Sequence, residues 1–241
     1  MNALTNSQPD GRVDSVIDVW WARVSELRGH HLDLLDTAET ARLARYRDVR
    51  ARDHFALGAV LLRSALGSIL DTDAGGLVLD RTCRRCGRPH GKPMLIESSL
   101  EFSVSHSGGV VLAAVAGAVP VGVDVEAIRE IDYEGLLRDV CAPSEQDTVT
   151  SPEDFFRMWA RKESVLKATG DGLDVPMSNV ELSIVGDGAV LKRYEGRPGI
   201  RAAIRDIDVT PGVAAAAAGL GDDIDVRVHD GRALLIKPAS R

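Results

Sequence analysis

Two carboxylates, Asp124 and Glu126, stand two residues apart in the run V-G-V-D-V-E at 121–126. Successive side chains of a strand point to opposite faces, so these two acids share one face and the valines line the other. Parallel carboxylates at this spacing repel each other unless a cation lies between them, and hard oxygen ligands suit magnesium. The same pattern is also typical of an amphipathic edge strand with solvated acids, so alone it leaves both interpretations open.

A second motif, W-A-R-K-E-S-V-L-K-A at 159–168, places Glu163 and Lys167 four residues apart on one helical face. An ordinary surface ion pair has the same spacing. A carboxylate that joins a metal, with a lysine one turn later, would instead suit phosphoryl chemistry. Lys162 adds a second cation beside Glu163. We expect the two lysines, together with a bound cation, to depress the pKa of Glu163.

A third motif, S-V-S-H-S-G at 103–108, places Ser105 and His106 where a strand ends in a tight turn. Backbone N–H groups of such a turn can face a phosphate together with the side chains. The loop G-K-P at 91–93 adds Lys92. A histidine in a turn can equally be structural, and a loop lysine is usually solvated.

The spacing of apolar residues and the helix-capping residues predict the helices and strands that carry these motifs. Asp36 and Glu39 resemble a capping box that opens a helix through Tyr46, and apolar spacings of three and four predict a second helix over 51–70. Alternation predicts strands over 101–105, 110–116 and 121–126. Ser151, followed by a proline, predicts a helix start at 152, and Gly170 predicts its end.

The rest of the chain, 180–236, reads as short strands: 180–184, 189–193, 213–218 and 224–228. The run 102–125 is faintly repeated by 207–228, which suggests two similar lobes. The length of 241 residues suffices for one large domain or two small lobes, with 44% hydrophobic and 27% charged residues.

Composition also argues against membrane-spanning, exported and nucleic-acid-binding proteins. No uninterrupted apolar run approaches the ~18 residues that span a bilayer, and the polar N-terminus lacks the layout of a signal peptide. Three cysteines cannot all pair, which favours a reducing, cytoplasmic setting. The formal net charge of −7 argues against a nucleic-acid partner.

In their order along the chain, G-K-P, F-S-x-S-H-S-G, V-G-V-D-V-E and W-x-R-K-E-S-x-x-K resemble the signature of the Sfp-like 4′-phosphopantetheinyl transferases. The resemblance implies an α/β (α+β) fold of two pseudo-symmetric lobes. Each lobe would be a small, largely antiparallel sheet packed with a long helix, and coenzyme A would lie in a cleft between them. We expect the lobes to comprise residues 1–119 and 120–241.

The resemblance further implies a Mg²⁺-dependent, monomeric enzyme. It would move the phosphopantetheine arm of coenzyme A, its co-substrate, onto a serine of an apo acyl or peptidyl carrier protein, releasing 3′,5′-ADP. Magnesium would be held by Asp124, Glu126 and Glu163. The catalytic residues would be Glu163, Lys167 and Lys162. Contacts to coenzyme A would come from Arg42, Lys92, Ser105, His106, Lys162 and Lys167. Where the family usually has an arginine near the start of the second helix, this chain has His54 or Arg52.

Other interpretations stay open at this point. Cys83 and Cys86, with His90, could form part of a zinc site, for which Cys141 is a distant fourth candidate. Such a knuckle together with the arginine-rich run at 42–52 would suit a nucleic-acid binder. A coenzyme A-binding regulatory module without transfer is the remaining alternative.

Overall fold

Two sheets form the frame of this computed structural model, which describes residues 16–82, 87, 93–96 and 98–236. The first has the strand order β11-β1-β5-β4 and the second β6-β10-β9-β8-β7. All neighbours are antiparallel except β1 and β11. The strands of the first sheet are β1 (Val16–Arg23), β4 (Glu101–Ser107), β5 (Val110–Ala116) and β11 (Asp225–Asp230). Those of the second are β6 (Val121–Ala127), β7 (Val180–Val185), β8 (Gly188–Tyr194), β9 (Ala202–Asp206) and β10 (Val213–Leu220).

Of the predicted helices, the one that starts at Pro152 has both of its predicted limits, and the one predicted over 51–70 begins two residues earlier, at Val49. The α-helices are α1 (Thr37–Leu43), α2 (Val49–Leu70), α3 (Leu137–Val140), α4 (Pro152–Thr169) and α5 (Arg232–Leu235). A small hairpin pairs β2 (Leu79–Asp80) with β3 (Met94–Leu95), and short 3₁₀ turns include η5 (Gln146–Thr148) and η7 (Met177–Asn179). The Asp36–Glu39 capping box is present, although α1 ends three residues before the predicted Tyr46. Ser151 accepts from Asp154 N at 3.1 Å, and Gly170 ends α4 with φ +77°.

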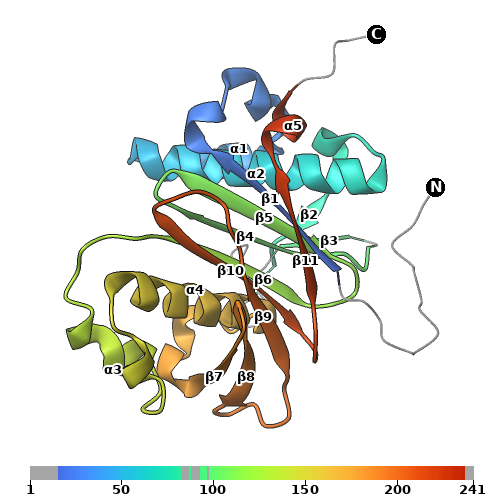
Figure 1. Ribbon diagram of the computed structural model, residues 1–241. Coiled ribbons are helices and arrows are strands. Elements are labelled where there is room, and N and C mark those ends of the chain that lie inside the picture. The colour runs from blue at the N-terminus through green and yellow to red at the C-terminus, as the bar shows by residue number, and fades with distance from the viewer. Residues whose placement is uncertain (1–15, 83–86, 88–92, 97, 237–241) are drawn as a thin grey trace.

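The layers run α2, first sheet, second sheet, α4 (Figure 1). Val19 and Leu112 of the first sheet pack with Val123 and Ala217 of the second in one shared core. Two further cores lie between each sheet and its long helix. By length and composition α2 could span a membrane, but most of it is buried in the protein, as in a core helix.

The two halves repeat one plan. In the first, β1 leads to α2 and the strand order is β1-β5-β4; in the second, β6 leads to α4 and the order is β6-β10-β9. The mixed helix and sheet fold predicted from the sequence is therefore confirmed. The predicted division at residue 120 differs in one respect, because β11 and α5 return to the first sheet and to α2. Residues 225–235 thus belong to the first half although they end the described chain.

Candidate active site

Strand β6 places Asp124 and Glu126 on one face, as predicted. Val121, Val123 and Val125 on the opposite face are fully buried, and Asp124 is itself only 2% exposed. The face that carries Asp124 also carries Gly122, and α4 packs directly on it. A Cβ at Gly122 would lie 1.9 Å from the backbone oxygen of Ser164, so glycine is required for this close approach.

Three alternate serines of β4 join the edges of the two sheets. The backbone N–H groups of Val123, Val125 and Ala127 on β6 donate to the hydroxyls of Ser103 (3.1 Å), Ser105 (3.4 Å) and Ser107 (3.0 Å). Ser107 in turn donates to Glu126 Oε2 at 3.2 Å. Each pair is separated by 20 residues, so the two strands run in register and in the same direction. We name this arrangement, Ser103, Ser105 and Ser107 with β6, the serine ladder.

Lys167 of α4 reaches this junction. Its Nζ lies 2.7 Å from Asp124 Oδ1, 2.9 Å from Ser105 Oγ and 3.2 Å from the carbonyl oxygen of Val123. Ser105 also donates to Asp124 Oδ1 at 2.7 Å. The Lys167 side chain is 25% exposed, so its ammonium is reachable from solvent while it holds the nearly buried Asp124.

At the junction, the place where Asp124 of β6, Ser105 of β4 and Lys167 of α4 meet, two buried carboxylate oxygens lie without a hydrogen-bond donor among the described residues. Asp124 Oδ2 and Glu163 Oε2 have no hydrogen-bond partner within the described part of the chain. A buried oxygen of this kind is costly unless a ligand or ion satisfies it. Among the described residues, no three His, Cys, Asp or Glu side chains lie close enough together to form a metal site as they stand. The donor set nevertheless fits a hard cation, because the two unsatisfied atoms and Glu126 are all carboxylate oxygens.

In the protein without a cation, burial is the main influence on the pKa of Glu163. Burial raises the pKa of Glu163 above its ordinary value; Lys167 opposes that rise, and Asp124 adds to it. We expected two lysines and a bound cation to depress it. Lys162 does not face this carboxylate, and the effect of a bound cation stays a prediction. Burial, followed by the charge of Asp124, likewise raises the pKa of Glu126. In the protein alone, the junction disfavours negative charge, as expected where carboxylates gather without a cation.

Two histidines stack beside the serine ladder. The rings of His54 and His106 lie 5.0 Å apart at 19°, and His54 Nε2 accepts from the backbone N–H of Gly109 at 3.2 Å. His106 is exposed, yet partial burial of its ring and the neighbouring His54 lower its pKa. His54, not Arg52, therefore occupies the position beside the turn. Arg52 pairs with Asp53 at 2.9 Å and lines a separate cavity.

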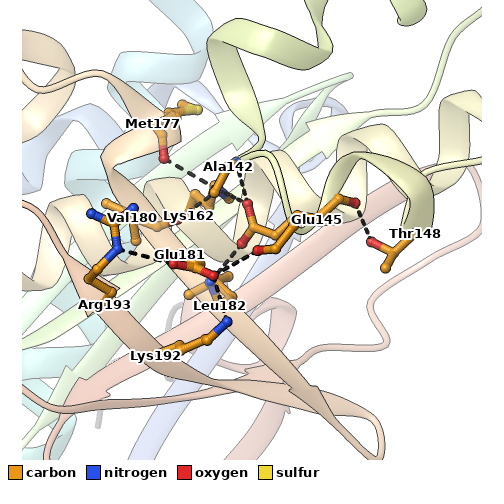
Figure 2. A network of polar contacts seen from close by, with 11 residues as sticks. Ala142, Glu145, Thr148, Lys162, Met177, Val180, Glu181, Leu182, Lys192 and Arg193 are labelled. Carbon is orange, nitrogen blue, oxygen red and sulfur yellow. Dashed lines mark hydrogen bonds and ion pairs between the residues drawn. The ribbon is translucent and has the colours of Figure 1, made fainter.

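Lys162 does not lie at this junction, and the prediction that it contacts phosphates there is wrong. Its side chain is fully buried on another face of α4, where Nζ lies 2.5 Å from Glu145 Oε2 and 2.6 Å from the carbonyl oxygen of Val180 (Figure 2). Consecutive helical residues point about 100° apart, so Lys162 and Glu163 serve different sides of the helix.

The remaining predicted residues are placed as follows. Arg42 is exposed on α1 and lies over the ring of Phe55 at 4.7 Å, apart from the contacts of Asp124 and Lys167. Lys92, Cys83, Cys86 and His90 lie outside the described residues. Cys141 is 1% exposed in the core beneath α4, and burial raises the pKa of its thiol to about 11. A neutral, buried thiol of this kind is a poor zinc ligand.

Sequence reasoning missed Ser103, Ser107 and Glu145, and it did not decide on His54. The alternation S-x-S-x-S at 103–107 was a visible signal for three hydroxyls on one strand face. Nothing local pointed to Glu145, because its partner Lys162 is 17 residues away.

Comparisons with known proteins agree with the motifs. Residues 120–217 match the model of the 4′-phosphopantetheinyl transferase superfamily. The chain is 35% identical over 161 residues to 4′-phosphopantetheinyl transferase HetI of Nostoc sp. strain PCC 7120, covering 62% of this chain and 65% of that protein. It is 36% identical over 110 residues to psf-1 of Bacillus pumilus (43% and 47%) and 28% identical over 166 residues to Sfp of Bacillus subtilis strain 168 (61% and 71%). The chain thus spans less than two thirds of the first two of these relatives.

Proposed function

Because the chain belongs to the 4′-phosphopantetheinyl transferase superfamily, we propose that it transfers the 4′-phosphopantetheine group of coenzyme A to a serine of an acyl or peptidyl carrier protein. The reaction depends on Mg²⁺ and releases 3′,5′-ADP. The observation that carries the proposal is the pair of buried, unsatisfied oxygens of Asp124 and Glu163, with the Lys167 ammonium beside them. A pyrophosphate needs a cation and a positive side chain at one point. This junction has carboxylate oxygens that suit a cation and the ammonium of Lys167 beside them.

Asp124, Glu126 and Glu163 are the residues that would hold magnesium. Bound there, the ion would polarise phosphate oxygens of coenzyme A and offset the charge that builds as the phosphorus–oxygen bond breaks. Asp124 is prepared for this role, since Ser105 and Lys167 both hold Oδ1 and leave Oδ2 unoccupied by any described group.

Lys167 offsets charge on the transferring phosphate. The serine hydroxyl of the carrier forms the new bond to the β-phosphorus, and the bond to the bridging oxygen of the pyrophosphate breaks. The electron pair of that bond leaves with 3′,5′-ADP. Lys167 is held by Asp124, Ser105 and the carbonyl oxygen of Val123, but it is partly exposed. By releasing the longest of these contacts, the one to Val123, it could donate to the bridging oxygen.

Glu163 takes the serine proton, directly or through water, or else serves mainly as a metal ligand. Without a cation, burial raises the pKa of Glu163, and a bound magnesium ion would oppose that rise. His106 and Ser105, with Arg42 and Lys92, bind the nucleotide phosphates in this proposal. The cytoplasmic location and monomeric state remain predictions.

The decisive experiment is intact-mass analysis of apo-carrier proteins incubated with this protein, coenzyme A and Mg²⁺. We expect a gain of one phosphopantetheine, lost in EDTA and in a carrier whose acceptor serine is replaced by alanine. No mass gain on any acyl or peptidyl carrier, with correctly folded protein and excess Mg²⁺, would refute the proposal.

A further inference from the structure

Lys162 and Glu145 form a buried ion pair on the side of α4 that faces away from Asp124. Lys162 is 0% exposed and Glu145 3% exposed. The ammonium of Lys162 donates to Glu145 Oε2 at 2.5 Å, to the carbonyl oxygen of Val180 at 2.6 Å and to that of Met177 at 3.4 Å. The ammonium is fully buried and has three acceptors, so a substrate cannot reach it.

Glu145 is engaged through both oxygens. Oε2 also accepts from the backbone N–H of Ala142 at 2.6 Å, and Oε1 accepts from that of Leu182 at 2.6 Å. One carboxylate thus ties the segment before η5 and the edge strand β7 to α4. Figure 2 shows these three segments meeting at Glu145 and Lys162.

A second, outer set of contacts closes the same region. Glu181 of β7 accepts from Ser144, Lys192 and Arg193 at 2.7, 2.7 and 3.1 Å. Lys192 is 55% exposed, whereas Lys162 is fully buried. The two lysines therefore offer a matched comparison: each pairs with a glutamate of this network, but only Lys162 lies on α4.

Lys162 lies on the same helix as two residues of the candidate active site, so its ion pair with Glu145 can influence both of them. Glu163 is the next residue and Lys167 lies five residues on, so the rotation and axial position of α4 set where both side chains point. A buried, fully hydrogen-bonded ion pair has one acceptable geometry, because any displacement leaves charges unsatisfied in the core. The opposite side of α4 is held by the close packing of Ser164 on Gly122.

We infer that Lys162 and Glu145 are positioning residues, which hold α4 in the rotation that aims Glu163 at the Asp124 junction without either touching substrate. This inference rests on the proposed function for its kinetic consequence. It predicts that the pair sets metal affinity and transfer rate together, and that coenzyme A binding is largely independent of it.

The test compares Lys162→Met, Glu145→Gln and the double variant with the wild-type protein, using Lys192→Met as the control. Each is assayed for transfer per folded molecule, with the folded fraction taken from circular dichroism. Both single variants should raise the Mg²⁺ concentration for half-maximal rate and lower kcat by about tenfold, the lower end of what loss of an outer partner of a metal site costs. The KM for coenzyme A should change less than twofold, and Lys192→Met should match the wild type.

Binding of Mn²⁺, followed by electron paramagnetic resonance in the absence of substrates, separates this inference from the proposed function. Both single variants should bind Mn²⁺ about tenfold more weakly than the wild type, whether or not any carrier is modified. The double variant removes both buried charges, so it should regain much of the lost stability while keeping the weak Mn²⁺ binding.

Two results would overturn the inference. If Lys162→Met raises the KM for coenzyme A and Glu145→Gln changes nothing, Lys162 acts on the substrate. If the variants melt at lower temperature but the folded molecules bind Mn²⁺ and turn over like the wild type, the pair is structural only. A wild type that binds Mn²⁺ tightly but transfers nothing would refute the proposed function and leave the positioning role intact.

Discussion

Lys167 Nζ lies 2.7 Å from Asp124 Oδ1, and this contact leaves Asp124 Oδ2 buried with no partner among the described residues. One oxygen of the carboxylate is thus held by the protein's own cation, and the other is open to a second positive charge.

Asp124→Ala should abolish transfer while the protein stays folded, because the valine face of β6 is untouched. We expect a loss of at least about 100-fold, since even an outer partner of a metal site can be worth that much. The rate is measured across a Mg²⁺ titration, with the exposed Glu130→Gln as control. Near wild-type turnover at limiting Mg²⁺ would show that Asp124 is not a metal ligand.

Lys167→Ala should lower kcat on the order of 100-fold, as for removal of one donor to developing charge, and affect coenzyme A affinity less. The measurement is kcat and KM from initial rates, compared with Lys192→Ala. An unchanged kcat with only a raised KM would reduce Lys167 to a ground-state anchor.

Glu163→Gln should lower the transfer rate at least about 100-fold. In EDTA at pH 7 it should also raise the melting temperature, because it removes a buried, unsatisfied charge. The sign follows from the pKa of Glu163, which is raised in the fold above its ordinary 4.5: ionisation destabilises the protein above that value. The increase in melting temperature of Glu163→Gln over the wild type should therefore vanish below about pH 4.5, where the carboxyl group is protonated in both the folded and the unfolded protein. Scanning calorimetry at pH 4 and 7 checks this, and a lower melting temperature at pH 7 would contradict it.

For the same variant, the pH–rate profile at saturating Mg²⁺ separates the two roles of Glu163. Loss of the acidic limb would identify it as the base. A limb identical to wild type, with the rate restored by excess metal, would identify it as a ligand and place the base elsewhere.

Gly122→Ala should separate α4 from β6, because the added Cβ would meet the backbone oxygen of Ser164. We expect a loss of about 1–3 kcal/mol in the free energy of unfolding, with a fall in activity. Gly117→Ala is the control, since a Cβ there meets nothing within 4 Å. Urea unfolding measures both, and equal stability of the two variants would contradict the packing at Gly122.

Glu181 should make stability depend on acid pH. Hydrogen bonds from Lys192, Ser144 and Arg193 lower its pKa from 4.5 to about 2. A depressed carboxyl pKa stabilises the fold above its unfolded value, so this contribution is present above pH 4.5 and lost progressively toward pH 2. Both cationic partners are more than half exposed, which limits each ion pair to about 1 kcal/mol or less. Urea unfolding of Glu181→Gln should thus converge with wild type as pH falls, whereas Glu195→Gln should follow wild type throughout.

The sequence alone determined the local features of the site. Because side chains of a strand alternate between its two faces, the sequence placed Asp124 and Glu126 on one strand face. Because a helix has 3.6 residues per turn, it placed Glu163 and Lys167 on one helical face. The caps at Ser151 and Gly170 set the limits of α4. These are short-range properties, because the backbone geometry of a strand or helix decides them within a few residues.

Only the tertiary structure decided which neighbours these faces meet. Lys162 was assigned to the phosphates from the family resemblance, yet its ammonium pairs with Glu145 in the core. The serine ladder, the His54–His106 stack and the return of β11 to the first sheet join residues 20 or more positions apart. Such pairings depend on how the sheets and helices pack, and on which buried charge each packing leaves to be satisfied. Periodicity shows that two side chains share a face, but only packing shows what that face touches.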